Sequence, residues 1–357
     1  MKTHPFAFIL IGSTSLWAGE IGDDLANQVI LPATATHPLE GWSFAFGVSS
    51  ILGAEADFSG LGRRQSPFTA APTGITADRN YDNGSNLIDD TGNAGGLTSF
   101  WSYENPSQFD PSGTGSISLS IFNSNQDALA QADDVGFGIE IFAYKEFGDV
   151  PISFIPNAKW GLRFGYGTNS FEFDNNSVLS SSVDVITDSF DLGNATPPAA
   201  PFVGSPTGFG NALLGDSPIR STSTTSAVVS GSREIEATLV QFSAGSYIDF
   251  PLSENISVRG EAGLSLALAH GDYSFSSTTT IENLDPQFTQ SSESDTTVLP
   301  GFYAGLSAVY QINDNTSFDL GIRYQYFDSF SIETGGSQAE IDFSGSFLTS
   351  AAISFSY

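Results

Sequence analysis

Residues 347–357 read FLTSAAISFSY, and apart from Thr349 every second residue of this stretch is apolar or aromatic. Successive side chains of an extended strand point to opposite faces of a sheet. Ile353, Phe355 and Tyr357 therefore fall on one face, and small serines fall on the other. The pattern predicts a strand with one apolar face and one polar face.

The same alternation recurs upstream, most clearly where Trp160, Phe164 and Tyr166 alternate with glycine and arginine. The composition favours strands too, since the chain has 37 Gly, 30 Phe, 11 Tyr and only 14% charged residues. Aromatic and glycine-bounded segments suit strands and turns rather than helices. An all-β chain is predicted, with strands in residues 42–51, 135–147, 158–173, 233–249, 256–275, 298–310, 316–327 and 339–357.

The amino-terminal segment has the features of a secretory signal peptide. Lys2 precedes an apolar stretch and a region of small residues, and cleavage is expected after Ala18. Residues 1–18 are thus predicted to be removed, and residues 19–41 to form a periplasmic segment. No later run reaches the roughly 18 apolar residues of a membrane-spanning helix. If the mature chain lies in a membrane, it crosses as strands.

The connections between the predicted strands alternate in length. Short ones fall near residues 148–157, 251–255 and 313–315, and long polar ones lie between them. Outer-membrane barrels have short periplasmic turns and long extracellular loops in this order, with aromatic girdles at both interfaces. We therefore predict a closed antiparallel transmembrane β-barrel over residues 42–357, in the outer membrane. Its girdle residues would be Trp42, Trp160, Tyr310, Phe355 and Tyr357.

The predicted number of strands is eight, with ten as the alternative. The ten-stranded version adds residues 97–104 and 116–122 as a hairpin, which keeps an even number and leaves both termini periplasmic. In the eight-stranded version these two segments form a β-excursion within a large first loop, residues 52–134. A second large loop spans residues 175–232. Loops of this length are commonly functional or disordered.

At Ile353, Phe355 and Tyr357 the chain resembles outer-membrane β-barrel proteins, whose last strand ends on such a signal for the barrel-assembly machinery. The layout is similar to that of the eight-stranded OmpA- and OmpX-like group. Residues 81–84 (YDNG), 98–103 (TSFWSY), 215–218 (GDSP) and 321–326 (GIRYQY) resemble segments of a family of uncharacterised bacterial outer-membrane proteins. Because that family has no assigned activity, the resemblance implies only the fold and an outer-membrane localisation.

The charge balance excludes nucleic acid as a partner. With 11 Lys plus Arg against 40 Asp plus Glu, the formal net charge is −29, and such a field repels nucleic-acid backbones. The acidity serves solubility, or surface carboxylates bridge to lipopolysaccharide through divalent cations, which bind oxygen ligands. The expected partners are outer-membrane lipid and lipopolysaccharide. The chain has no Cys, so disulfides and thiolate chemistry are excluded.

If the aromatic faces meet lipid, the opposite faces line the barrel interior. An isolated buried charge is costly, and an eight-stranded interior is just wide enough for side chains to fill it. We therefore predict an ion-pair ladder that plugs the interior, with a gated small pore as the alternative. The residues predicted to form it are Glu140, Arg163, Arg259, Glu261, Asp319 and Arg323.

The sequence gives no sign of a catalytic, metal or cofactor site. Of His37 and His270, only His270 lies near a carboxylate, Asp272, and strand parity places it on the lipid-facing series. The acidic stretch at 82–86 lacks the spacing of a calcium loop and is predicted to be a turn. The expected function is a non-enzymatic structural or surface-interaction role. A small pore or transport accessory is the alternative, and a lipid-modifying enzyme is a third hypothesis.

Overall fold

The computed structural model describes residues 39–74, 76–88, 96–112, 115–150, 157–208 and 212–357. The predicted signal peptide, residues 1–18, lies outside the described residues, as does nearly all of the predicted periplasmic segment, residues 19–41. His37 lies outside them too.

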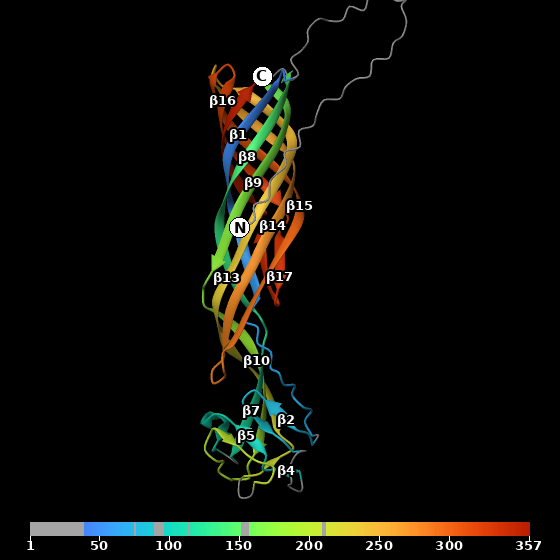
Figure 1. Ribbon diagram of the computed structural model, residues 1–357, viewed down its shortest axis with the longest axis vertical. Helices are drawn as coiled ribbons and strands as arrows, with labels where there is room; N and C mark the ends of the chain where they lie inside the picture. Colours follow the sequence, from blue (N-terminus) through green and yellow to red (C-terminus); the bar gives the residue numbers. More distant parts are fainter. Residues whose placement is uncertain (1–38, 75, 89–95, 113–114, 151–156, 209–211) are drawn as a thin grey trace, which may run out of the picture. The chain divides into compact units, whose positions relative to one another are not determined.

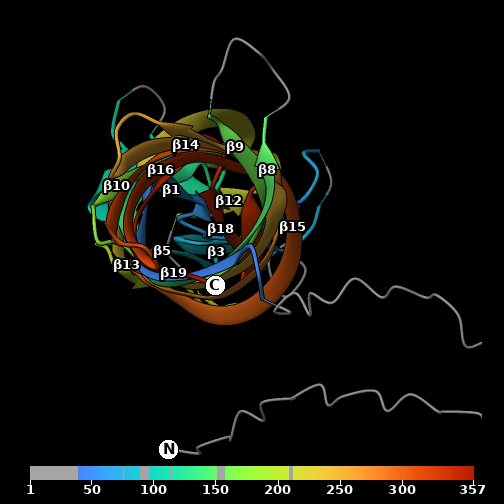
Figure 2. The ribbon, with the colours of Figure 1, turned by 90° about the horizontal axis from the view of Figure 1, so that it is seen from above.

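Long antiparallel strands form a closed ring of pairings. The order β1, β8, β9, β13, β14, β15, β16, β19 returns to β1, and β13 pairs with β14. The ring is seen end-on in Figure 2 and from the side in Figure 1. The predicted all-β, antiparallel fold is confirmed. The strands are β1 (Trp42–Leu61), β8 (Ala128–Asp149), β9 (Lys159–Asn175), β13 (Ile219–Pro251), β14 (Ile256–Thr280), β15 (Gln287–Asn313), β16 (Thr316–Phe327) and β19 (Ser346–Ser356).

One end of the ring carries short connections, such as the turn between Asn313 and Thr316, and we call it the turn end. From the turn end, an apolar band covers the outside of the ring. Along β14, Leu264, Leu266 and Leu268 are 73%, 49% and 42% exposed. Such continuous apolar exposure is unusual on a protein surrounded by water.

Beyond this band the apolar face changes sides. Along β14 the outward series continues with polar residues from His270 onward, while Ala269, Tyr273 and Phe275 point inward and are buried. The same inversion occurs on β13 and β9, so the ring interior becomes apolar where its exterior becomes polar. The buried residues form what we call the inner apolar cluster, which includes Ile51, Phe58, Phe171, Phe173, Ile235, Leu239, Phe327, Phe330, Ile341 and Leu348.

A hairpin contributes to this inner apolar cluster. β17 (Phe330–Thr334) pairs with β18 (Ser337–Asp342), and β18 pairs in turn with β1. Gly335 and Gly336 connect them with φ of +58° and +81°, a backbone conformation that glycine adopts without steric cost. The predicted strand 339–357 is thus interrupted between β18 and β19.

The two predicted long loops contain strands that pair with one another. The first loop holds β2 (Arg79–Tyr81), β3 (Gly84–Asn86), β4 (Leu97–Thr98), β5 (Trp101–Tyr103), the 3-10 helix η1 (Pro106–Gln108), β6 (Phe109–Asp110) and β7 (Ser116–Ser124). The second holds β10 (Leu179–Asp191), β11 (Phe202–Val203), β12 (Leu214–Gly215) and the start of β13. We call strands β2–β7 and β10–β12 the loop module.

The predicted excursion pairs partly within the first loop, where β5 pairs with β3 and β7 with β6. It also takes partners from the second loop, which the prediction did not include: β5 pairs with β11, β4 with β12 and β7 with β10. Sequence alternation could not reveal this, because several of these strands are two or three residues long. The turn predicted at 82–86 is borne out in part: Asp82 and Asn83 connect β2 to β3.

A small apolar core of the loop module includes Trp101 and Phe190. Asp188 is buried beside it and accepts hydrogen bonds from Tyr81 Oη at 2.6 Å and from Arg220 at 2.7 and 2.8 Å. The buried Asp188 carboxylate is thus hydrogen-bonded by two side chains, as burial of a charged group requires.

Candidate functional site: the charged interior of the ring

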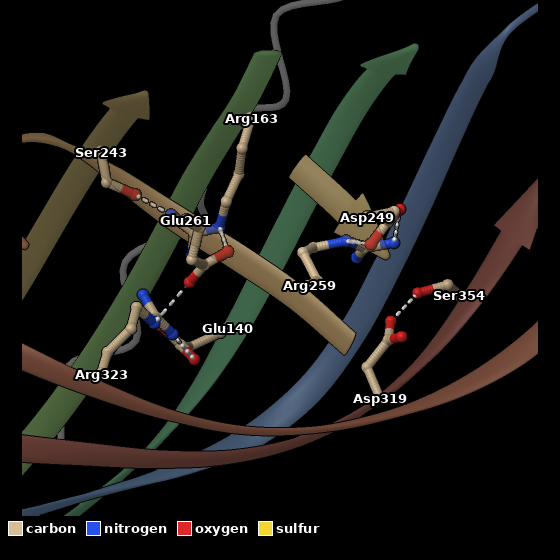
Figure 3. Close-up of polar contacts among 9 residues, drawn as sticks. All are labelled: Glu140, Arg163, Ser243, Asp249, Arg259, Glu261, Asp319, Arg323 and Ser354. Carbon is tan, nitrogen blue, oxygen red and sulfur yellow. Dashed lines mark hydrogen bonds and ion pairs between the residues drawn. The ribbon is translucent and has the colours of Figure 1, made fainter. Parts of the chain in front are cut away.

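The six residues predicted to line the interior all point into the ring, as Figure 3 shows. Glu140 comes from β8, Arg163 from β9, Arg259 and Glu261 from β14, and Asp319 and Arg323 from β16. Each sits one position from an outward apolar residue, so strand alternation directs it inward. Arg163 has no exposed surface, and Glu140 is 2% exposed.

Four of these residues form what we call the charged cluster: Glu140, Arg163, Glu261 and Arg323. Arg323 Nη2 donates to both carboxylate oxygens of Glu140, at 2.7 and 2.6 Å. Arg323 Nε lies 3.3 Å from Glu261 Oε1, and Arg163 Nε lies 3.2 Å from Glu261 Oε2, as an ion pair without a directional hydrogen bond. The cluster alternates in sign across the ring, which compensates its buried charges.

Aromatic rings complete the surroundings of the two arginines. The guanidinium of Arg163 lies 4.2 Å from the ring centre of Phe142 and 4.9 Å from that of Tyr303. Arg323 lies 5.2 and 5.9 Å from the same two rings. Aromatic faces attract cations, so these rings hold the guanidinium groups in place and fill the space around them.

The other two predicted residues lie nearer the turn end and have partners that the sequence analysis missed. Arg259 donates from Nε to Asp249 Oδ1 at 2.9 Å and from Nη2 to Asp249 Oδ2 at 3.0 Å. Asp319 accepts a hydrogen bond from Ser354 Oγ. Asp249 faces Arg259 across the β13–β14 pair, so the cross-strand register was the signal that could have identified it.

A cavity of about 490 Å³ opens at the turn end and reaches this second group. Tyr247, Asp249 and Arg259 are among the residues that line it. The guanidinium of Arg259 lies 4.3 Å from the ring centre of Tyr144 and 5.1 Å from that of Tyr247. Water therefore reaches the interior from the turn end only as far as side chains that are already paired.

On the other side of the charged cluster, a layer of amides and hydroxyls crosses the interior. Asn169 Nδ2 donates to Ser49 Oγ at 3.1 Å, and Gln325 Nε2 donates to Gln241 Oε1 at 3.1 Å. A Cβ at Gly138 would lie 1.8 Å from the Thr168 carbonyl oxygen, so this layer is tightly packed. The inner apolar cluster follows. Charged, amide and apolar layers thus fill the ring in succession.

The remaining predicted residues lie on the outside. Ile353, Phe355 and Tyr357, expected to form the assembly signal, are 45%, 43% and 61% exposed. His270 also faces outward, at the border of the apolar band. Its Nδ1 lies 2.8 Å from Thr296 Oγ1 and its Nε2 lies 3.9 Å from Asp272 Oδ2.

Within the described ranges, no group of three or more His, Cys, Asp or Glu side chains is arranged to hold a metal ion. No helix in the part of the chain that the structure describes is long and apolar enough to cross a membrane.

No family model and no curated protein matches the chain. Among solved structures, it is similar to the outer membrane protease OmpT from Escherichia coli, with 8% identity and a TM-score of 0.35 over 91% of this chain and 99% of that one. It is also similar to the outer membrane protein OprG from Pseudomonas aeruginosa (10% identity, TM-score 0.31, 89% and 96% covered). A third is Ail, the attachment invasion locus protein of Yersinia pestis (9% identity, TM-score 0.25, 88% of this chain and 99% of that one covered).

Its antiparallel ring, its exposed apolar band and its inward, paired charges make this chain similar in fold to the outer-membrane β-barrel proteins.

Proposed function

We propose that this chain is an eight-stranded transmembrane β-barrel of the bacterial outer membrane, with a plugged interior and a structural or surface-interaction role. The observation that carries the proposal is the filled interior: Arg323 bridges Glu140 and Glu261, and amide and apolar layers lie above them. The apolar band faces lipid, the turn end faces the periplasm, and the loop module is the part offered to the exterior.

The proposal includes partners of the chain. Ile353, Phe355 and Tyr357 present the exposed terminal pattern that we expect the barrel-assembly machinery to read. Outer-membrane lipid contacts the band, and lipopolysaccharide surrounds the ring where its exterior becomes polar. Glu236 and Asp272 face each other across β13 and β14 at this level, and such like-charged neighbours repel unless counter-ions accompany them.

The first experiment is a conductance measurement on the purified, refolded protein in a planar lipid bilayer. We expect no steady openings, because ions would have to pass through paired buried charges and then through an apolar layer. Insertion is verified by the shift in gel mobility between heated and unheated samples. Silence with verified insertion supports the plugged barrel.

Reproducible openings would instead make this chain a pore, provided that they pass through the ring. Substitution of Gly165 provides that check, because an added Cβ would lie 2.4 Å from Ser243 Oγ and 3.1 Å from the Phe142 ring. Openings that Gly165→Leu abolishes would overturn the plugged interior. A matched outward change, Ala262→Leu on β14, should leave conductance as it is in the parent protein.

Catalysis at His270 is the other function to test. We expect His270→Ala to change no product formed from phospholipid, lipopolysaccharide or peptide, because both members of the His270–Asp272 pair are more than half exposed. Activated bases work in water-excluded surroundings with an oriented partner. A product that depends on His270 would make this chain an enzyme.

A further inference from the structure

The first part of β13 has a neighbouring strand on one side only. β10 pairs with β7 on one side and with residues 219–229 of β13 on the other. The other neighbour of β13 is β14, whose pairing begins with Val228 opposite Thr280 and continues toward the ring. Before Val228, that side of β13 has no strand beside it among the described residues. We call residues 220–226 of β13 the free edge.

The direction of the backbone groups follows from the pairing of β10. The carbonyl oxygen of Ser182 accepts a hydrogen bond from the N–H of Asn125 at 2.8 Å, so Ser182 is directed toward β7. Successive residues of a strand point their backbone groups to alternate sides, so odd residues of β10 are directed toward β13. Their partners on β13 are odd as well, for example Val183 opposite Thr225. The residues that direct N–H and C=O groups away from β10 are Arg220, Thr222, Thr224 and Ser226.

The opposite edge of this small sheet is covered, and the contrast defines the free edge. On β7, the N–H of Phe122 donates to Asp82 Oδ2 and the N–H of Ser120 donates to Asn83 Oδ1, both at 2.8 Å. On β13, residues 221–226 are all exposed. Within the described ranges, no backbone group of Thr222 or Thr224 has a partner on that side.

The free edge also lacks the features that keep other strands away. Protein edges are commonly blocked by proline, lysine or a bulge. Residues 220–226 contain neither proline nor lysine, and their register with β10 runs without a shift. The one charge, Arg220, is held by Asp188 at 2.7 and 2.8 Å. The free edge is therefore able to accept a further strand.

The charge distribution points to a second copy of this chain as that strand. With a formal net charge of −29, two copies repel each other over most of their surface. Residues 217–233, however, contain no Asp or Glu. The carboxylate opposite Thr224 on β10, Asp184, accepts a hydrogen bond from Asn125 Nδ2 at 3.2 Å. Two free edges can thus meet without opposing carboxylates within the paired strands.

The sequence of the free edge matches itself when one copy is reversed. A two-fold axis at Ser223 places Thr222 of one copy opposite Thr224 of the other, and Arg220 opposite Ser226. Every outward-directed residue then faces another one, and Thr–Thr neighbours stabilise a sheet. We propose that the free edges of two copies pair in this antiparallel register and join their two sheets into one.

This pairing places the two copies in different membranes. Residues 219–227 and the ring residues 233–249 belong to the same strand, β13, so the ring follows the free edge along one direction. Antiparallel pairing reverses that direction in the partner, and the two rings lie at opposite ends of the paired edges. The inference rests on the proposed function, in which the loop module faces the exterior. It adds that the partner is the same protein on a facing cell, where many weak contacts act together.

The test joins two cell populations through single cysteines, which the cysteine-free chain allows. Each population expresses the full-length Ser223→Cys protein with one of two epitope tags, and the populations are mixed and oxidised with copper phenanthroline. In the proposed register the two Ser223 residues form a non-hydrogen-bonded pair with Cα atoms about 4.5 Å apart, close enough for a disulfide. We expect a dimer that carries both tags.

Ser221→Cys is the matched control, because Ser221 has the same side chain, strand and face and is also exposed. In the proposed register its two copies lie about 14 Å apart, so no two-tag dimer should form. Ser221 instead faces Thr225, so mixing Ser221→Cys cells with Thr225→Cys cells should restore the dimer. Equal dimer from Ser221→Cys and Ser223→Cys alone would indicate random collision and overturn the proposal.

A proline at Thr224 tests the role of the backbone. The N–H of Thr224 is directed away from β10, so Thr224→Pro removes an outward donor and leaves the pairing with β10, as edge strands tolerate. In the Ser223→Cys protein it should abolish the two-tag dimer, with folding verified by the gel-mobility shift. A folded variant that still forms the dimer would contradict pairing through the backbone. Should the variant not fold, the comparison of Ser221→Cys with Ser223→Cys still decides.

Labelling separates failure of this inference from failure of the proposed function. Ser223→Cys should react with a membrane-impermeant maleimide on intact cells. If it reacts but forms no two-tag dimer, or forms disulfides only within one population or with another protein, the pairing between facing cells is wrong and the orientation stands. If it reacts only after the outer membrane is permeabilised, the proposed orientation is wrong, and this inference with it.

Discussion

Whether a buried charge has a partner decides how much it contributes to the stability of the fold. Glu140 is 2% exposed and receives both hydrogen bonds from Arg323 Nη2. Removing one member of a buried pair leaves the other uncompensated and costs about 3–5 kcal/mol. We expect Glu140→Ala to lower the free energy of unfolding by that amount, measured by urea titration of the refolded protein in lipid vesicles.

The exposed pair Lys159–Glu146 is the control, since its side chains are 52% and 38% exposed. Exposed pairs contribute about 0–1 kcal/mol, so Lys159→Ala should change the unfolding midpoint little. An equal loss in both variants would show that the charged cluster does not stabilise the ring more than surface charge does.

At the scale of elements, the stability of the loop module is expected to depend on pH through the buried carboxylate of Asp188. Burial alone would raise the pKa of Asp188, but hydrogen bonds from Arg220 and Tyr81 outweigh it and hold this pKa below its usual value. A carboxylate with a lowered folded pKa stabilises above its unfolded pKa of about 4 and loses that contribution as pH falls through the folded value. We expect the fluorescence of Trp101, buried in this module, to report unfolding below about pH 4.

Asp188→Asn tests the assignment. The variant should be less stable than the parent at neutral pH, because Arg220 loses its ionised partner, and its stability should fall less steeply on acidification. If the variant unfolds in acid as steeply as the parent does, carboxylates other than Asp188 cause the transition.

Elements also show how far the sequence could predict this fold. In β14 and β16, outward apolar residues such as Leu266 and Ile322 alternate strictly, so strand, face and inward charges were all predictable. The predicted strand 256–275 extends past Leu268 and Ala269, where the apolar series of β14 changes from even to odd residues, and stops five residues before β14 ends at Thr280. Residues 287–297 of β15 lie outside the predicted strand 298–310 because they are mostly polar, so no apolar alternation marks them. Asp249 was missed because its role depends on the neighbouring strand, and register is not visible in a single strand.

For the whole molecule, the proposed orientation predicts which residues are accessible from outside the cell. The chain has no cysteine, so single-cysteine variants carry one label each. Val203, 78% exposed in the loop module, should react with a membrane-impermeant maleimide in intact cells when replaced by cysteine. Glu254, in the β13–β14 turn, should react only after the outer membrane is permeabilised. The reverse pattern would invert the proposed topology.

Ring closure joins the two ends of the described sequence. Ser43 Oγ and Ser356 Oγ lie 2.9 Å apart although 313 positions separate them along the chain. Contacts between such distant positions form late, because the intervening loop must first be ordered. Until β19 is in place, β1 therefore keeps an unpaired edge. A chain shortened by its last strand would have an aggregation-prone edge with no strand to cover it.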